Sequence, residues 1–453
     1  MKSKIDNSVF QKYDREYVAH FRGGATFVIA EIMMAAEIEE RAEAQVRKIL
    51  GNNQEVFLRD LFPGGFIASS AGVFPTFAAA ANSLETPERA RYRMRDFVDV
   101  FGSYLPEFLP KEQGSVIRNS LHFGLDEIKL KNLRLYKILT SGITLQVAGM
   151  LAQIVAGSEH KNFVKQTLSQ AFKAIADHRK QEEPFFDNSA AQNILMQEIG
   201  ADMKMSDINA NIVVTAQRAY PRPNQQVNHY FINLVPNGTH TVLTEGPLQP
   251  TPDALMVDVV QSTIAVPLVT QAHNGLQDGG GLANGAEIMN YMNKNLKQGD
   301  RLGYVSFANI GRSLFANGDL PETARSLREA ANMESILTLS AKEAHESAIQ
   351  VMLNEHSYFL EIPVVFEDGE NTIRFNGNAA NMLDTSAEQI EAIKQHAQAW
   401  INANDAKIEE LAHNLACGYI GRKERELLNT VDAMTHRRDK LQLAHSLQPV
   451  AAQ

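Results

Sequence analysis

Two short segments far apart in the chain carry the side chains best suited to chemistry. The first surrounds Ser70 and the second surrounds Asp278. A serine hydroxyl becomes an effective nucleophile when a neighbouring base takes its proton, and a carboxylate can be that base. The two segments together predict a serine nucleophile with an aspartate base, provided that the fold brings them into contact.

Ser70 lies in a pattern typical of a tight turn between a strand and a helix. Such a turn lifts the serine hydroxyl above the end of a sheet and needs small residues two positions before and two positions after it. Ala68 and Gly72 occupy those positions. No charged residue occurs between positions 61 and 84, so we expect a buried strand over residues 64–68 and a packed helix after the turn.

Ser69 is a competing nucleophile. With Ser69 in that role, Ile67 and Ala71 would occupy the two flanking positions that must be small. Isoleucine is too large for this position, so we favour Ser70. A third interpretation gives Ser70 no chemistry, because a small-residue turn between strand and helix is common in α/β domains and its serine can simply cap the helix.

Three consecutive glycines follow Asp278. Glycine permits positive φ and leaves room for another group to approach closely. We therefore expect Asp278 to project from a tight glycine loop, where desolvation by apolar neighbours would make it a better base. An ordinary surface turn is the alternative for an Asp-Gly pair, but the run of small residues extends well past such a turn.

Two segments in the second half of the chain form a pattern together. They are Gln261-Ser262-Thr263-Ile264-Ala265-Val266-Pro267 and Asp278-Gly279-Gly280-Gly281-Leu282-Ala283-Asn284. This pattern resembles the patatin-like phospholipase family, and the chain would be a divergent member. The resemblance implies a catalytic dyad of Ser70 and Asp278, supported by Gly72, Gly279 and Gly280. It also implies a lipid acyl hydrolase of the phospholipase A or lysophospholipase type that forms an acyl-enzyme intermediate.

The resemblance also implies an oxyanion hole near the N-terminus. We expect a strand over residues 17–21 and a helix from residue 26, and the loop between them contains Gly23, Gly24 and Ala25. A loop at a helix N-terminus presents unpaired N–H groups and the positive end of the helix dipole to an anion. The backbone N–H groups of these three residues are therefore the expected oxyanion donors.

The chain departs from the family pattern in this region. Arg22 replaces the usual aspartate, Ala25 replaces the third glycine, and Phe27 lies near the usual place of a basic residue. The Ser70 turn also has Ala68 in place of its leading glycine. The main alternative is therefore a catalytically weakened patatin-like module that binds lipid or a protein partner. A serine hydrolase or acyltransferase for another ester is the third hypothesis.

Strands alternate with helices along the chain, which predicts an α/β fold. The resemblance implies a three-layer patatin-like fold, in which helices cover both faces of a mostly parallel sheet. We expect a catalytic domain over residues 16–403, with a mainly helical insertion over about 84–202, and a helical C-terminal extension over residues 404–453. Other expected strands are 210–216, 230–235, 241–243, 302–308, 358–365 and 372–375, and other expected helices are 286–297, 322–352 and 385–402.

Composition excludes several functional classes. The net charge of −10 argues against nucleic acid as a partner. A single cysteine, Cys417, removes a Cys-rich metal site and a disulfide framework, and we expect neither a metal nor another cofactor. The expected partner is a phospholipid or lysophospholipid substrate, met by transient contact with a membrane surface. A protein activator is left open.

The sequence also bears on location. Residues 1–15 are polar and charged, without the apolar core of a cleavable signal peptide. Residues 138–157 carry no charge but contain too many polar side chains for a transmembrane segment. We therefore expect a soluble protein that is cytoplasmic or exported without a cleavable signal peptide.

Overall fold

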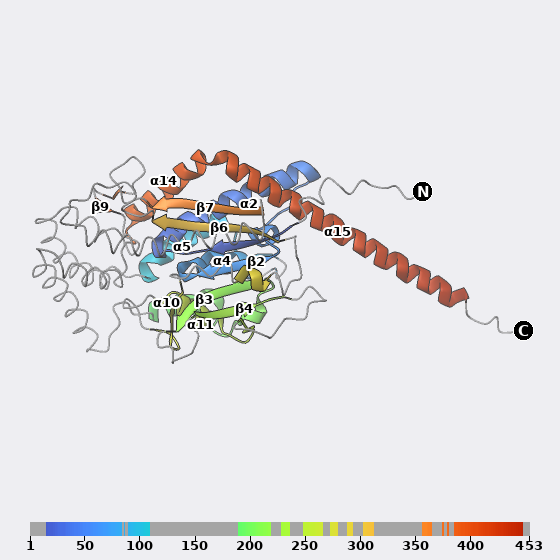
Figure 1. The fold of residues 1–453 in the computed structure, drawn as a ribbon, viewed down its shortest axis with the longest axis horizontal. Helices are drawn as coiled ribbons and strands as arrows, with labels where there is room; N and C mark the ends of the chain where they lie inside the picture. The colour runs from blue at the N-terminus through green and yellow to red at the C-terminus, as the bar shows by residue number, and fades with distance from the viewer. Residues whose placement is uncertain are drawn as a thin grey trace, which may run out of the picture.

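The computed structural model describes thirteen stretches of the chain. They are residues 15–83, 86, 89–108, 189–218, 228–235, 248–265, 272–279, 288–292, 302–311, 356–364, 374–375, 378–379 and 385–446. A central twisted sheet lies within these residues, with helices packed on it (Figure 1). The expected segments 138–157, 241–243 and 322–352 lie outside the described residues.

The central sheet is mixed and mostly parallel. Its strands are β1 (Glu16–Phe21), β2 (Gly65–Ser69), β3 (Ile212–Arg218), β4 (Asn228–Asn233), β5 (Leu276–Asp278), β6 (Leu302–Gly311) and β7 (Ser357–Val364). The order is β4-β3-β2-β1-β6-β7, and β5 also pairs with β3. β3, β2, β1, β6 and β7 run parallel to one another, whereas β4 and β5 run antiparallel to β3. A separate small sheet pairs β8 (Arg374–Phe375) with β9 (Asn378–Ala379).

Apolar side chains cover both faces of the central sheet. β1 and β2 are buried along their whole length, as is typical of parallel strands covered on both sides. Alternate strand residues point to opposite faces, so Phe21 and Phe307 stack on one face at 4.7 Å, while Val18 and Tyr304 belong to a second cluster on the other face. The expected α/β fold with a mostly parallel sheet is confirmed at this level.

The first face carries most of the described helices. They are α2 (Val28–Leu50), α3 (Leu58–Leu61), α4 (Val73–Ala80), α5 (Met94–Phe108), α10 (Ser189–Ile199), α11 (Met256–Thr263), α14 (Ala387–Ala403) and α15 (Asp405–Ser446), with short 3-10 turns η1 (Ala25–Phe27), η2 (Ser70–Gly72) and η3 (Met205–Asp207). On the second face, the described cluster includes Leu248 and the helical residues 288–292. Within the expected insertion over residues 84–202, the structure describes the two helices α5 and α10 and a few non-helical residues beside them.

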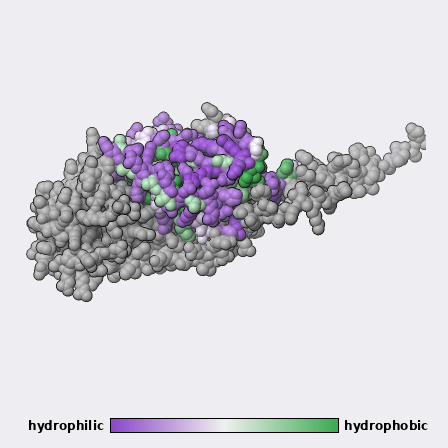
Figure 2. All heavy atoms as spheres, turned by 90° about the horizontal axis from the view of Figure 1, so that it is seen from above, coloured by the Kyte–Doolittle hydropathy of each residue, from purple (hydrophilic) through white to green (hydrophobic). Residues whose placement is uncertain are grey.

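The C-terminal helix α15 packs on α2 through its first half. Its residues Ile408, Leu411 and Leu415 are buried, and the Gln45 side chain on α2 donates to Glu409 at 2.6 Å. Figure 1 shows the far half of α15 extending away from the sheet. From above, the described surface is mainly hydrophilic, with hydrophobic residues in small separate areas (Figure 2). Within the described ranges, no helix combines the length and the apolar character needed to cross a membrane.

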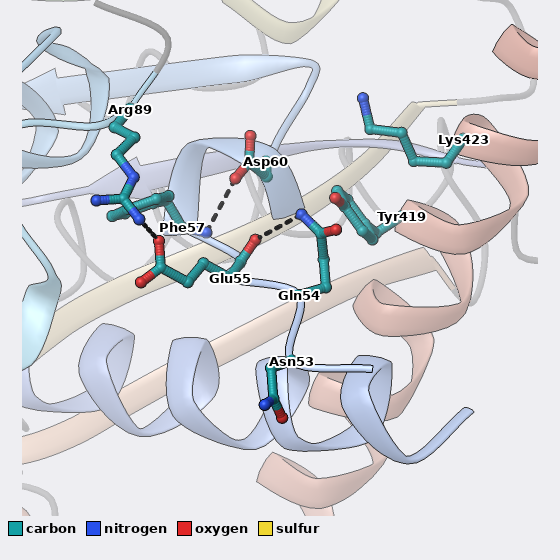
Figure 3. Close-up of a pocket in the computed structure, with 8 residues that line it drawn as sticks. All are labelled: Asn53, Gln54, Glu55, Phe57, Asp60, Arg89, Tyr419 and Lys423. Carbon is teal, nitrogen blue, oxygen red and sulfur yellow. Dashed lines mark hydrogen bonds and ion pairs between the residues drawn. The ribbon is translucent and has the colours of Figure 1, made fainter. Parts of the chain in front are cut away.

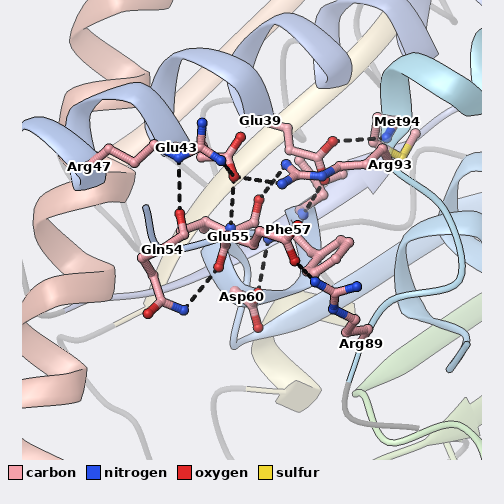
Figure 4. A network of polar contacts seen from close by, with 12 residues as sticks. Glu39, Glu43, Arg47, Gln54, Glu55, Phe57, Asp60, Arg89, Arg93 and Met94 are labelled. Carbon is pink, nitrogen blue, oxygen red and sulfur yellow. Dashed lines mark hydrogen bonds and ion pairs between the residues drawn. The ribbon is translucent and has the colours of Figure 1, made fainter. Parts of the chain in front are cut away.

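Helix α2 buries carboxylates that bind the backbone of neighbouring segments (Figure 4). Glu39 accepts hydrogen bonds from the N–H groups of Leu58 at 2.6 Å and Met94 at 2.9 Å. These residues begin α3 and α5, whose first N–H groups have no partner within their own helices. One buried carboxylate therefore caps two helices. Burial raises the pKa of Glu39 from 4.5 to about 7, although the two N–H groups act in the opposite direction.

Glu39 should make folding stability depend on pH. Because the folded chain holds the Glu39 proton more tightly than the unfolded chain, its contribution to stability is fully present below about pH 4.5 and is lost as pH rises to about 7. We expect Glu39→Gln to remove this dependence. The free energy of unfolding of Glu39→Gln minus that of the natural chain should therefore rise by about 3 kcal/mol between pH 4.5 and about 7. Urea unfolding at pH 5 and pH 8 measures this change, and equal slopes against pH in both proteins would contradict it.

Candidate active site

Ser70 occupies a strained turn at the carboxyl end of β2. The strand ends at Ser69, and the chain turns through η2 into α4. The φ of Ser70 is 52°, in the left-handed region that costs a residue with a side chain about 1–2 kcal/mol. Surrounding contacts must hold such a conformation, and it is the geometry expected of a nucleophile on a sharp turn.

Asp278 reaches Ser70 because β5 takes the place of β2 beside β3. Ser69, the last residue of β2, pairs with Thr215, and Asp278 pairs with Ala216, the next residue of β3. The opposite edge of β3 is occupied by β4 at the same position. Asp278 therefore lies directly beyond the end of β2.

The Ser70 hydroxyl donates a hydrogen bond to Oδ2 of Asp278 at 2.7 Å. The structure thus brings together the two residues that the sequence predicted as nucleophile and base. One expectation was wrong in detail, because Asp278 ends a short strand rather than projecting from a glycine loop. An Asn274-Gly275 turn precedes this strand, with φ of 51° and 74°, and this dipeptide is a hairpin signal that could have revealed β5.

The C-terminal end of α11 and the residues just after it hold both Ser70 and Asp278. The Thr263 hydroxyl accepts a hydrogen bond from the Ser70 N–H at 2.9 Å and donates to the Thr215 carbonyl at 2.6 Å. The Asp278 N–H donates to the Ala265 carbonyl at 2.8 Å. Thr263 is fully buried. The sequence pattern contained Thr263 but gave no sign of this role, which depends on the approach of three separate segments.

His273 adds another link between α11 and the turn before β5. Its Nε2 lies 2.6 Å from Oδ1 of Asp258, which belongs to α11. His273 also forms a bridge with Leu276, the first residue of β5. The strand that carries Asp278 is therefore held at its start by Asp258 and at its end by Ala265.

Ser69 has a different role from Ser70. Its hydroxyl donates to the Arg22 carbonyl at 3.0 Å, and the residue is buried. The side chain therefore joins the turn to the glycine loop that follows β1. This geometry favours Ser70 over Ser69 as the nucleophile.

The glycine loop packs tightly on the Ser70 turn. Gly23 and Gly24 have φ of 79° and 124°, and a Cβ on Gly23 would lie 2.6 Å from the Ser69 carbonyl oxygen. A Cβ on Gly72 would lie 2.2 Å from the Phe21 carbonyl oxygen. Glycine is therefore required at positions 23 and 72, because only an absent side chain permits these approaches.

The expected oxyanion donors do not all face the site. The Gly23 N–H donates to Oε2 of Glu31 on α2 at 3.1 Å, so this group is already used, contrary to the expectation. Gly24 is half-buried, and Ala25 begins η1. Among the other supporting residues, Gly279 packs against Thr215, where a Cβ would lie 2.5 Å from the carbonyl oxygen. Gly280 lies outside the described residues.

A wide depression of about 580 Å³ lies at the other end of β2 (Figure 3). Its lining comes from the segment around α3, which leads into the amino end of β2, and from α15. Its charged groups are engaged within the protein, since Glu55 pairs with Arg89 and the Asp60 carboxylate accepts the Phe57 N–H at 2.9 Å. This depression is separate from the dyad, which lies at the carboxyl end of β2.

No protein-family model matches this chain, and no curated protein sequence matches it either. Within the described ranges, no group of three or more His, Cys, Asp or Glu side chains is arranged to hold a metal ion. The case for a function therefore rests on the geometry of Ser70 and Asp278, together with the sequence resemblance.

Thr263 should stabilise the strained turn through its hydroxyl. Thr263→Val keeps the shape of the side chain but leaves the Ser70 N–H and the Thr215 carbonyl without this partner. We expect the free energy of unfolding to fall by about 2 kcal/mol, the typical effect of unsatisfied buried polar groups. Thr263→Ser is the matched control because it retains the hydroxyl. Equal stability of the two variants in urea unfolding would argue against this role.

Proposed function

We propose that this chain is a serine acyl hydrolase in which Ser70 is the nucleophile and Asp278 is the general base. The observation that carries the proposal is the 2.7 Å hydrogen bond from the Ser70 hydroxyl to the Asp278 carboxylate. Two further features support it, namely the left-handed φ of Ser70 and the position of the pair at the carboxyl ends of parallel strands, where α/β proteins bind ligands.

The proposed reaction has two steps. Ser70 Oγ attacks the ester carbonyl carbon while its proton passes to Asp278. The new bond between Oγ and this carbon gives a tetrahedral intermediate. The ester bond then breaks, and the alcohol leaves with the proton from Asp278. Water attacks the resulting acyl-enzyme, giving its proton to Asp278. The carboxylic acid is released as Ser70 regains its proton.

A dyad without histidine requires a base that is already oriented. Asp278 meets this requirement because its backbone pairs with Ala216 on one side and its N–H donates to Ala265 on the other. Thr263 fixes the Ser70 backbone in the same way. The positions of nucleophile and base are thus set by backbone contacts, which preorganises the pair for proton transfer.

The substrate class follows from the sequence resemblance. We propose that the substrates are fatty-acyl esters of phospholipids or lysophospholipids, and that the fold is the three-layer patatin-like arrangement. Helices on one face of the sheet and an apolar cluster on the other support this arrangement. The alternative is a module of the same fold that binds lipid or a protein partner but has lost catalysis. The departure of the oxyanion loop from the family pattern favours this alternative.

Labelling with a fluorophosphonate probe tests the proposed chemistry. We expect the natural chain to react and the adduct to map to Ser70 by mass spectrometry. Ser70→Ala should abolish labelling, and Asp278→Asn should slow it by about 10²–10⁴-fold, the usual contribution of a general base. Analysis of the acids released from mixed phospholipids then identifies the ester that is cleaved.

Ser69→Ala is the matched control for the labelling experiment. Because Ser69 contacts the Arg22 carbonyl and not Asp278, the variant should still form an adduct at Ser70. An adduct on Ser69, or a folded natural chain that never reacts with the probe or with any ester, would contradict the proposed function.

A further inference from the structure

Glu31 is a fully buried carboxylate directly behind the candidate active site. It lies in the first turn of α2 and has no exposed surface. Its Oε2 accepts the Gly23 N–H at 3.1 Å. Burying a carboxylate costs free energy unless hydrogen bonds compensate for its lost hydration. We therefore expect the hydrogen bond between Glu31 and the Gly23 N–H to be kept in the folded protein, which fixes the loop.

The loop that Glu31 holds is also fixed on its other sides. The Arg22 N–H donates to the Phe307 carbonyl at 3.2 Å, and the Arg22 carbonyl accepts the Ser69 hydroxyl at 3.0 Å. Gly23 lies so close to the turn that a Cβ there would be 2.9 Å from the Ala71 nitrogen. A small movement of Gly23 would therefore change the arrangement of N–H groups beside Ser70.

We infer that Glu31 is a positioning residue for the oxyanion hole. By binding the Gly23 N–H, it fixes the loop in the conformation in which the N–H groups of Gly24 and Ala71 are the oxyanion donors. This inference rests on the proposed function. Ala71 follows the nucleophile, the position that supplies one donor in strand-turn-helix hydrolase sites. Gly24 follows Gly23 in the loop and is only half-buried, so we assign its N–H as the second donor.

Substitutions of Glu31 can separate two physical effects on an oxyanion. A negative charge behind the hole would oppose a developing oxyanion, whereas the hydrogen bond to Gly23 would preserve the geometry. A glutamine keeps an oxygen that can accept the Gly23 N–H but carries no charge. An aspartate keeps the carboxyl group but is one methylene too short to keep the contact. The two replacements therefore separate loss of the contact from loss of the carboxyl group.

Ester hydrolysis by the full chain is the test, with kcat, KM and thermal stability measured on the natural chain, Glu31→Gln, Glu31→Asp and Glu31→Ala. We expect Glu31→Gln to keep kcat within about threefold. Glu31→Asp and Glu31→Ala should lower kcat by about 10–100-fold with little change in KM, because misplacing a transition-state donor costs about this much.

Glu39→Ala is the matched control, since Glu39 is a buried carboxylate on the same helix that binds backbone N–H groups away from the dyad. It should lower thermal stability and leave kcat unchanged. Similar kcat values for Glu31→Gln and Glu31→Asp would overturn the inference, even if Glu31→Ala does not fold. A natural chain that lacks both esterase activity and fluorophosphonate labelling would instead overturn the proposed function itself.

Discussion

The candidate site depends on the way two strands share one edge of β3. β2 pairs with this edge as far as Thr215, and β5 continues from Ala216 in the opposite direction. The change of partner leaves the last residue of β5 beside the turn that follows β2. A hydrogen bond between Ser70 and Asp278, which are 208 positions apart in the chain, is thus set by sheet register. A shift of one residue in either strand would turn one of the side chains to the other face.

The strain at Ser70 is compensated by the elements around it. Its left-handed φ is unfavourable for serine, but its N–H donates to Thr263 and its hydroxyl donates to Asp278. Thr263 belongs to α11, and Asp278 belongs to the strand that follows α11 in the chain. Both contacts therefore come from the part of the chain that begins with α11, so a displacement of α11 would disturb Ser70 and Asp278 together.

Helix α2 organises its surroundings with buried carboxyl groups. Glu31 binds the loop after β1, Glu39 caps α3 and α5, and Glu43 accepts the Val56 N–H at 3.3 Å. Arg93 forms an ion pair with Glu43 at 2.6 Å. Hydrogen bonds to these carboxyl groups take the place of hydrophobic contacts beside α2. Because hydrogen bonds are directional, they restrict the positions of the bound loops more than apolar contacts do. The raised pKa of Glu39 shows the cost of that burial.

Local patterns along the chain were sufficient to predict the α/β class and the strands around residues 17–21 and 64–68, because buried strands and small-residue turns depend on near neighbours. The segments around Ser70 and Asp278 were also evident from the sequence, but their pairing as a dyad was implied by the family resemblance. The short strand β5, the roles of Thr263 and Glu31, and the loss of Gly23 as an oxyanion donor could not be predicted in this way. Each requires segments distant in sequence to meet at hydrogen-bonding distance, and only the packing of α2, α11 and the sheet decides which backbone groups are already used.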